Sequence, residues 1–236
     1  MEATLRPGDV LYDIGANVGA YTLVASKLCT SSGRVYAFEP SFFNFGQLCR
    51  NILLNKSEAN VVPLMLALFT RTEINKFHFQ NLECGGSTHV FSRTIDYKAE
   101  EFAPAASLST IGFSLDDFVH LPGVDPPTVI KVDVDGLEHA ILQGASNLLL
   151  RPEIRSILLE VNEDLEDETT AVIELLHQKG FRAREKHQLH RRLHHYLFNR
   201  YAAHDLPPQK MSEVPVTANR CESIFKNPCE PPLLCL

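Results

Sequence analysis

A chain of 236 residues is long enough to form one α/β domain with a substantial buried core. Apolar residues make up 44% and charged residues 22%, which is the balance of an ordinary globular protein. The formal net charge of -7 provides no overall attraction to nucleic acid or to an anionic membrane, and no apolar segment approaches the length of a membrane span. We therefore expect neither a nucleic-acid partner nor a membrane span in this chain.

The 6 cysteines are spread along the chain and form no Cys-x-x-Cys pair. This spacing favours reduced thiols over a disulfide framework or a zinc site. It predicts a reducing compartment such as the cytoplasm. The first predicted strand begins only a few residues after Met1, so we expect that the chain could be one domain of a longer protein.

Short apolar runs alternate with segments of helical period along the chain, which predicts a mostly parallel sheet with helices on both faces. Ser114 and the acids that follow it indicate a helix start, and Gly180 indicates a helix end. The predicted strands cover residues 9–15, 34–40, 60–69, 75–80, 128–136 and 154–163, and the predicted helices cover 19–29, 45–55, 114–121, 137–149 and 167–180.

Two segments lack this alternation and are predicted to be insertions in a single domain of residues 1–227. Residues 81–113 are rich in Gly, Ser and Thr and predict an irregular stretch with at most one hairpin, whose "ECGGSTHVF" could form a loop over a substrate. Residues 182–216 predict a basic insertion between two final strands, "FRAREKH" and "RCESIFKN". Residues 228–236 read as a loose tail.

Within the basic insertion, Leu189, Leu193 and Leu197 recur at helical spacing, which predicts a helix with one packed face. His190 and His194 would then share a face, but no nearby carboxylate or thiol completes a ligand set, so we expect no metal. The cations are typical of a solvated face and could alternatively attract an acidic substrate.

Four of the predicted strands end in a carboxylate: Asp13, Glu39, Asp133 and Glu160. The carboxyl ends of parallel strands line the ligand crevice of an open α/β sheet. A carboxylate is costly to bring near a core and needs a partner there. The pattern therefore predicts a ligand site lined by these acids.

The turn "DIGANVG" contains Gly15 and Gly19 with Asn17 between them, so it lacks the G-x-G of the dinucleotide fingerprint. Asp13 would repel the pyrophosphate of such a cofactor, but it would attract S-adenosylmethionine, which carries a sulfonium and an ammonium group. Glu39 could accept both ribose hydroxyls. A tight turn without a ligand, and an NAD(P)-dependent oxidoreductase, remain the alternatives.

Several segments in order resemble the FkbM-type class I methyltransferases: "DIGANVGAYTL", "GRVYAFEPSFFNFGQLCRNILLN", "GGS", "FSLDDFV", "VIKVDVDGLEHAILQGA", "ILLEVNED" and "RCESIF". The resemblance implies a three-layer Rossmann-like fold, with a mostly parallel seven-stranded sheet and an antiparallel last strand. It implies S-adenosylmethionine as cofactor and a hydroxyl of a sugar, glycan or small metabolite as acceptor. An acidic acceptor and a homodimer are further options.

Carried over by residue, the resemblance implies a cofactor site around the glycine turn. Thr22 would lie behind this turn, Glu39 would hold the ribose, and Ala67 would present backbone to the adenine. Asp133 could bind the cofactor's ammonium or cap the next helix. The implied cofactor set is Asp13, Gly15, Asn17, Gly19, Thr22, Glu39, Pro40, Asn44, Ala67 and Asp133.

Methyl transfer to a hydroxyl requires a group that takes the hydroxyl proton. Asp133 is the first candidate, followed by Asp135 and Glu160; the family often has Glu at position 135. His139 fits better as a helix-surface residue. A non-catalytic domain that kept the cofactor site is the remaining alternative.

Overall fold

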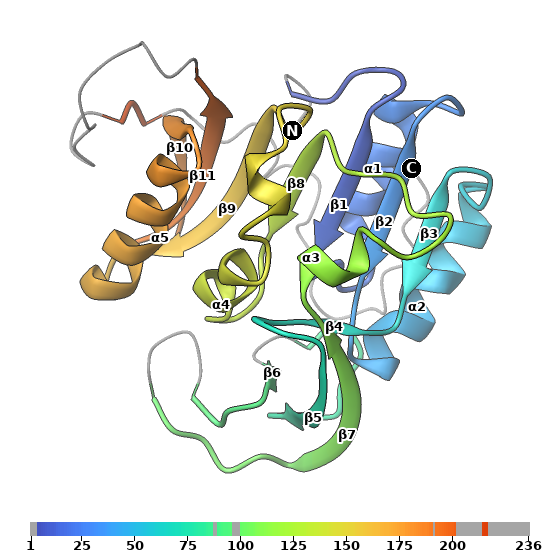
Figure 1. The fold of residues 1–236 in the computed structure, drawn as a ribbon. Coiled ribbons are helices and arrows are strands. Elements are labelled where there is room, and N and C mark those ends of the chain that lie inside the picture. The colour runs from blue at the N-terminus through green and yellow to red at the C-terminus, as the bar shows by residue number, and fades with distance from the viewer. Residues whose placement is uncertain (1–3, 87–88, 96–99, 191, 202–213, 217–236) are drawn as a thin grey trace.

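A computed structural model describes residues 4–86, 89–95, 100–190, 192–201 and 214–216. Its main element is a seven-stranded sheet in the order β10-β11-β9-β8-β1-β2-β3 (Figure 1). Neighbouring strands from β9 to β3 are parallel, whereas β11, the last strand, is antiparallel to both neighbours, which confirms the predicted sheet. The strands are β1 (Val10–Ile14), β2 (Arg34–Phe38), β3 (Val61–Leu64), β8 (Val129–Val132), β9 (Ser156–Asn162), β10 (Phe181–His190) and β11 (Leu193–Arg200).

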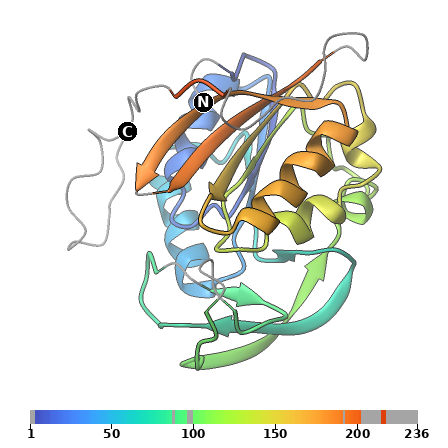
Figure 2. The ribbon, with the colours of Figure 1, turned by 90° about the vertical axis from the view of Figure 1, so that its left-hand side faces the viewer.

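Helices cover both faces of this sheet and make the fold three-layered (Figures 1 and 2). The central strands β1 and β8 are apolar at nearly every position because both of their faces are covered. The longest helices, α2 and α5, have 13 residues each. The helices are α1 (Ala20–Cys29), α2 (Phe42–Leu54), α3 (Leu115–Phe118), α4 (Glu138–Gln143) and α5 (Glu166–Gln178), with a 3₁₀ turn at Leu148–Leu150.

The sheet separates two hydrophobic clusters that fix which side each helix occupies. On one face, Leu11 of β1 packs with Leu23 of α1 and Leu48 of α2. On the other face, Tyr12 contacts Phe118 of α3 edge to face, with ring centroids 5.8 Å apart. Alternate residues of β1 therefore pack against helices on opposite faces of the sheet, because successive side chains of a strand point to opposite faces.

A second, four-stranded sheet lies beyond the carboxyl ends of the main sheet in the order β4-β7-β5-β6 (Figure 1). The single strand predicted over 60–69 is wrong, because its second half forms β4 and joins the other sheet. The irregular insertion predicted over 81–113 is also wrong in part, because β7 is a regular strand of 8 residues. The strands are β4 (Ala67–Leu68), β5 (Glu73–Phe79), β6 (Val90–Phe91) and β7 (Ala106–Phe113).

The basic segment is a hairpin of β10 and β11, so the helix expected from the spacing of its leucines is wrong, whereas β10 confirms the strand predicted at "FRAREKH". Residues 182–200 are thus the last two strands of the sheet and not an insertion between them. β11 inserts between β9 and β10, so both of its faces are largely buried. The predicted strand at 220–227 and the tail at 228–236 lie outside the described residues.

Gly180 follows the C-cap residue of α5 and has a φ of 85°, which confirms the predicted helix end. The cysteines at 29, 49 and 84 are free thiols. No helix in the described part of the chain has the length and apolar character that crossing a membrane requires.

Candidate active site

The glycine turn between β1 and α1 uses its own backbone donors inside the protein. Gly15 and Ala16 donate to the carbonyl of Phe38 over 3.1 and 3.0 Å, and Gly19 donates to Ala16 over 2.8 Å. The Asn17 N–H donates to a carboxylate oxygen of Glu39 over 2.9 Å. A pyrophosphate needs such N–H groups to be free, so this turn is a poor dinucleotide site.

Acceptor atoms, by contrast, are left over at this turn. The side-chain oxygens of Asn17 and Ser41 are buried and have no hydrogen-bond partner in the described part of the chain. Buried polar atoms without partners are uncommon and need an explanation. A ligand rich in donors, such as one with an ammonium group and two ribose hydroxyls, would satisfy them.

Close packing explains the two glycines of the turn. Gly15 and Gly19 have φ values of 75° and 95°. A Cβ on Gly15 would lie 1.9 Å from the carbonyl oxygen of Asp133, and one on Gly19 would lie 2.7 Å from Leu48. Both glycines are therefore required by the approach of neighbouring elements, whether or not a ligand binds.

Glu39 follows β2 and is held rigidly beside the turn. One of its oxygens accepts from Asn17 and the other from the backbone of Ser41, each over 2.9 Å. The side chain of Asn44 also hydrogen-bonds this carboxylate, and the acceptor capacity that remains could serve a ribose hydroxyl. Burial raises the pKa of Glu39 to about 7, against the opposing effect of the two N–H donors and of Lys131.

Asp13 is fully buried and lies behind the turn. Its carboxylate accepts a 2.6 Å hydrogen bond from Thr22, which therefore has the position expected for it. The ammonium of Lys131 lies 3.2 Å from Asp13 and 3.1 Å from Asp133. Lys131 therefore neutralises much of the charge of Asp13, and Asp13 would repel a pyrophosphate less than the sequence predicts.

Lys131 is a site residue that the sequence reasoning missed. Its side chain is only 2% exposed, and its ammonium donates to the carbonyls of Gly15 and Ile14 over 3.1 and 3.4 Å. Coulombic attraction to Asp13 and Asp133 outweighs the opposing effect of burial and raises its pKa. The available signal was a lysine in the otherwise apolar strand "VIKV".

Asp133, Glu160 and His195 lie in a row across three strands at the carboxyl edge. Val132 of β8 pairs with Leu159 of β9, so Asp133 and Glu160 come one position later on neighbouring strands. His195 of β11 pairs directly with Glu160. Residues opposite one another in a sheet point to the same face, so the register brings the three side chains together. Of the predicted catalytic set, Asp133 and Glu160 thus meet, and His195 joins them unpredicted.

Burial and crowding shift the pKa values in this row. Burial, followed by the charge of Asp133, raises the pKa of Glu160 to about 9. Burial lowers the pKa of His195 to about 4, although Asp133 opposes the shift. Such perturbed groups gathered at one sheet edge are typical of a functional site.

The turn after β8 is closed by Glu138, whose carboxylate accepts from the N–H groups of Val134 and Gly136 over 3.2 and 3.4 Å. Burial raises the pKa of Glu138 to about 8. Asp135 lies in the same half-buried turn, and its charge adds to the rise of the pKa values of Glu138 and Glu160.

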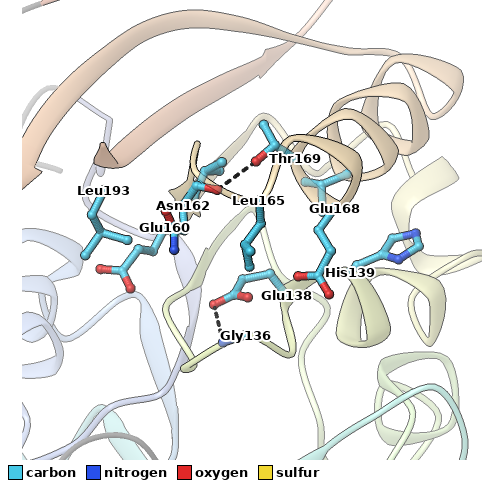
Figure 3. Close-up of a pocket in the computed structure, with 11 residues that line it drawn as sticks. Gly136, Glu138, His139, Glu160, Asn162, Leu165, Glu168, Thr169 and Leu193 are labelled. Carbon is cyan, nitrogen blue, oxygen red and sulfur yellow. Dashed lines mark hydrogen bonds between the residues drawn. The ribbon is translucent and has the colours of Figure 1, made fainter. Parts of the chain in front are cut away.

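A pocket opens beside this turn, and Figure 3 shows side chains from α4, β9, α5 and β11 around it. Glu160 and Glu138 supply carboxylates to its wall, and Leu193 and Leu165 supply apolar surface. His139 also borders it from α4, where it is half-buried. The pocket thus joins the row of strand-end groups to a space that could hold an acceptor.

The predicted adenine-side residues lie on the opposite flank of the turn. Asn44 is buried, and its side-chain amide bonds the backbone of Gly85 and Gly86 over 2.8 and 3.0 Å, which fastens the loop around "CGG" to α2. Pro40 follows Glu39 and is half-buried. Ala67 is buried and pairs with Gly112 in the second sheet. Their contact with a cofactor stays a prediction.

The acids of α3 have the structural roles that their positions suggested. Ser114 caps the helix by accepting from the N–H of Asp117 over 3.1 Å. Asp116 accepts from the N–H groups of Asn147 and Leu148. Neither acid belongs to the row at the sheet edge.

A seven-stranded Rossmann-like sheet with one antiparallel strand, together with acids and a donor-poor turn at its carboxyl edge, defines the class I methyltransferase architecture. A crystal structure of methyltransferase FkbM from Methylobacillus flagellatus KT shares this fold, with a TM-score of 0.53 and 17% identity over 81% of this chain and 43% of the other. The model of the methyltransferase FkbM domain family matches residues 13–183. The chain belongs to this family, and membership supports S-adenosylmethionine as the methyl donor.

Two curated relatives are similar in sequence. The hexuronic acid methyltransferase AglP of Haloferax volcanii is 28% identical over 154 residues, which cover 65% of this chain and 56% of the relative. The 31-O-demethyl-FK506 methyltransferase FkbM of Streptomyces tacrolimicus is 27% identical over 195 residues, which cover 75% of this chain and 74% of the relative. The chain therefore matches little more than half of the first relative's length.

Proposed function

We propose that this domain binds S-adenosylmethionine at the glycine turn and transfers its methyl group to a hydroxyl oxygen of a sugar, a glycan or a related small metabolite. The observation that carries the proposal is the balance of donors and acceptors at the turn. The N–H groups of Gly15, Ala16, Asn17 and Gly19 are engaged, whereas buried oxygens of Asn17 and Ser41 are not. This balance suits a cationic cofactor with many donors.

The residues of the turn suit the parts of this cofactor. Glu39, whose carboxylate is held by Asn17, Ser41 and Asn44, would use its remaining acceptor capacity for a ribose hydroxyl. The free side-chain oxygen of Asn17 would accept from a donor of the methionine part. When bound, the cofactor supplies a methyl group on a positively charged sulfur, ready for in-line displacement.

The row at the sheet edge would then align the acceptor and take its proton. Asp133 is the most exposed of its three side chains, at 28%, and Lys131 holds its carboxylate in place. Positioning of an acceptor oxygen against the methyl group can supply several kcal/mol of rate enhancement. The pocket beside Glu160 is where we place the acceptor in this proposal.

The names of the relatives support an oxygen acceptor. One is named for a hexuronic acid and the other for an O-demethylated compound. Arg93 donates to the carbonyl of Gly136, which lines the pocket, and its guanidinium would place a positive charge near an acidic sugar bound there. An acidic acceptor is therefore part of the proposal.

The free thiols of Cys29, Cys49 and Cys84 agree with a reducing compartment.

Calorimetric titration with S-adenosylhomocysteine and, separately, with NADPH tests the cofactor. Binding of S-adenosylhomocysteine alone supports the proposal, whereas binding of NADPH alone contradicts it. A panel of neutral sugars and uronic acids, assayed for S-adenosylhomocysteine release, tests the acceptor. Cofactor binding without turnover on any acceptor would favour a non-catalytic domain.

The variant Asp133→Asn separates binding from catalysis. If Asp133 takes the acceptor proton, turnover falls by about 100-fold or more while cofactor affinity changes little. If affinity falls as much as turnover does, Asp133 is a cofactor ligand instead. The variant Asp117→Asn, at an acid on α3 outside the site, is the matched control and should leave both quantities unchanged.

A further inference from the structure

We propose that Asp133, Glu160 and His195 form a binding site for a divalent first-row transition-metal ion, and that Mn²⁺ is the ion it binds. One potential ligand atom from each side chain lies within 4.8 Å of the other two. The cation site stands on these three residues and does not require the methyl-transfer proposal. Only its use in catalysis rests on that proposal.

The separations are too long for direct contact and suited to a shared ion. The Nε2 atom of His195 lies 3.8 Å from an oxygen of Glu160 and 3.9 Å from an oxygen of Asp133. A hydrogen bond would require about 3 Å. Ligand atoms about 2.2 Å from one ion lie about 3.1 Å apart at octahedral angles and about 3.6 Å apart at tetrahedral angles. His195 would therefore need to shift by less than about 1 Å toward each carboxylate to share a cation with it.

His195 provides an independent observation. Its side chain is 9% exposed, and its buried Nε2 has no hydrogen-bond partner in the described part of the chain. The atom is directed at two carboxylates, which are the remaining members of the proposed ligand set. A buried imidazole nitrogen normally has a partner, and neutral imidazole is the commonest metal ligand in proteins.

The strand register makes the arrangement rigid. His195 and Glu160 are directly paired between β11 and β9. The ring of Tyr21 lies edge to face with the imidazole of His195, with centroids 6.0 Å apart. Ligands placed on packed strands hold their geometry better than ligands on loops, and their positions cost little entropy on binding.

The charge and the donor types select the ion. A carboxylate loses its proton when it binds a metal ion, and with Glu160 ionised the carboxylates of Asp13, Asp133 and Glu160 and the ammonium of Lys131 carry a formal charge of -3 + 1 = -2, which a divalent cation balances. Carboxylates suit Mg²⁺, Ca²⁺ and Mn²⁺, whereas imidazole suits the transition metals. The mixture of one imidazole and two carboxylates therefore favours Mn²⁺ over Mg²⁺ or Ca²⁺.

Three protein ligands leave coordination positions open for another molecule. Glu160 belongs both to this row and to the lining of the pocket shown in Figure 3. An acceptor in the pocket would therefore approach a bound cation from the side of Glu160. Neighbouring oxygens of a sugar, or a uronic acid carboxylate with its adjacent hydroxyl, are the acceptor chemistry that such positions would bind.

Mn²⁺ titration of the metal-free domain, followed by the electron paramagnetic resonance signal of free Mn²⁺, tests the site without acceptor or turnover. We expect one Mn²⁺ per chain, with affinity about 10- to 100-fold weaker in His195→Gln and in Glu160→Gln. The variant His194→Gln is the matched control, because His194 lies on the same strand but faces the other side of the sheet. It should bind Mn²⁺ as the unaltered domain does.

Titration of each sample with S-adenosylhomocysteine reports whether the domain is folded and separates this inference from the proposed function. Stoichiometric Mn²⁺ binding without S-adenosylhomocysteine binding would support the cation site and count against the proposed cofactor. S-adenosylhomocysteine binding without stoichiometric Mn²⁺ binding would overturn the cation site alone. Equal Mn²⁺ affinity in the unaltered domain and in folded His195→Gln or Glu160→Gln would overturn it as well.

Discussion

Replacement of the buried Lys131 by methionine should destabilise the domain strongly, because it strands a carboxylate. Lys131 and Asp13 are 2% and 0% exposed, and their charged atoms lie 3.2 Å apart. The Lys131 ammonium is also the nearest cation to Asp133, at 3.1 Å. Methionine preserves most of the apolar stem but removes the charge, so the carboxylate of Asp13 would keep only its hydrogen bond from Thr22.

Removal of one partner of a buried ion pair typically costs 3–5 kcal/mol, because the other charge remains desolvated. Two hydrogen bonds from Lys131 to the backbone of the glycine turn disappear as well. For a domain of this size each kcal/mol lowers the melting temperature by roughly 2–4 °C, so we expect a fall of about 6–20 °C. Urea unfolding at pH 7 measures the same loss as a free energy.

The double variant Asp13→Asn/Lys131→Met identifies the cause. If the stranded charge dominates, the second change should restore most of the lost stability, because the neutral amide costs less to bury than the carboxylate. A Lys131→Met variant within about 1 kcal/mol of the unaltered domain would refute the electrostatic reasoning. A double variant no more stable than Lys131→Met would show that packing, and not charge, is the cause.

Three further changes test the turn and its neighbours. Burial raises the pKa of Glu39 from 4.5 to about 7, so the folded domain binds this proton more tightly than the unfolded chain does. The stability from this group is therefore present below about pH 4.5 and is lost as the pH rises through 7. Relative to Glu39→Gln, the unliganded domain should lose ~3 kcal/mol of unfolding free energy over that range in urea titrations, and parallel curves for the two proteins would disprove this. Gly15→Ala should cost at least ~3 kcal/mol, whereas Gly85→Ala, with a similar φ but open space, should cost about 1 kcal/mol; equal costs would remove the steric argument. Thr22→Val should cost ~1–3 kcal/mol in thermal or urea unfolding by removing the hydrogen bond to Asp13, and an unchanged stability would show that the bond contributes little.

The main sheet was predictable because its strands are short apolar runs punctuated by glycine and by terminal acids. β1, β2, β8 and β9 coincide with predicted strands to within a few residues. The family resemblance supplied the seven-stranded topology, which periodicity alone does not determine. Strand order depends on long-range packing that no local pattern records.

The hairpin of β10 and β11 shows why a local pattern can mislead. Leu189, Leu193 and Leu197 are spaced by four, which places residues on one face of a helix and equally on one face of a strand. The sequence therefore could not choose the period from these leucines. The choice matters, since a helix would have grouped His190 with His194, whereas the strand directs His195 to Glu160.

β7 was missed for a different reason. Its sequence "ASLSTIGF" is small and polar, and most of its residues are exposed or half-buried. Such a strand owes its conformation to pairing with β5 along seven residue pairs and not to its own hydrophobic pattern. The second sheet as a whole was therefore visible in the sequence only through the alternation in β5.

The sequence predicted the acidic residues of the site but not its lysine, Lys131, or its histidine, His195. Asp13 was expected to select the cofactor by charge, yet Lys131 lies against it and offsets that charge. The charge of a single residue is thus a weak predictor of which ligand a site binds, because a neighbouring strand can supply the opposite charge.

Hydrogen-bond accounting discriminates between cofactors where charge does not. Each backbone N–H serves one strong acceptor, and Gly15 and Ala16 both serve Phe38, which joins the turn to the end of β2. A pyrophosphate that used these N–H groups would have to break these bonds and the one from Asn17 to Glu39, which also position the carboxylate. The bonds that shape the turn therefore disfavour a dinucleotide, and they leave Glu39 aligned for a ribose.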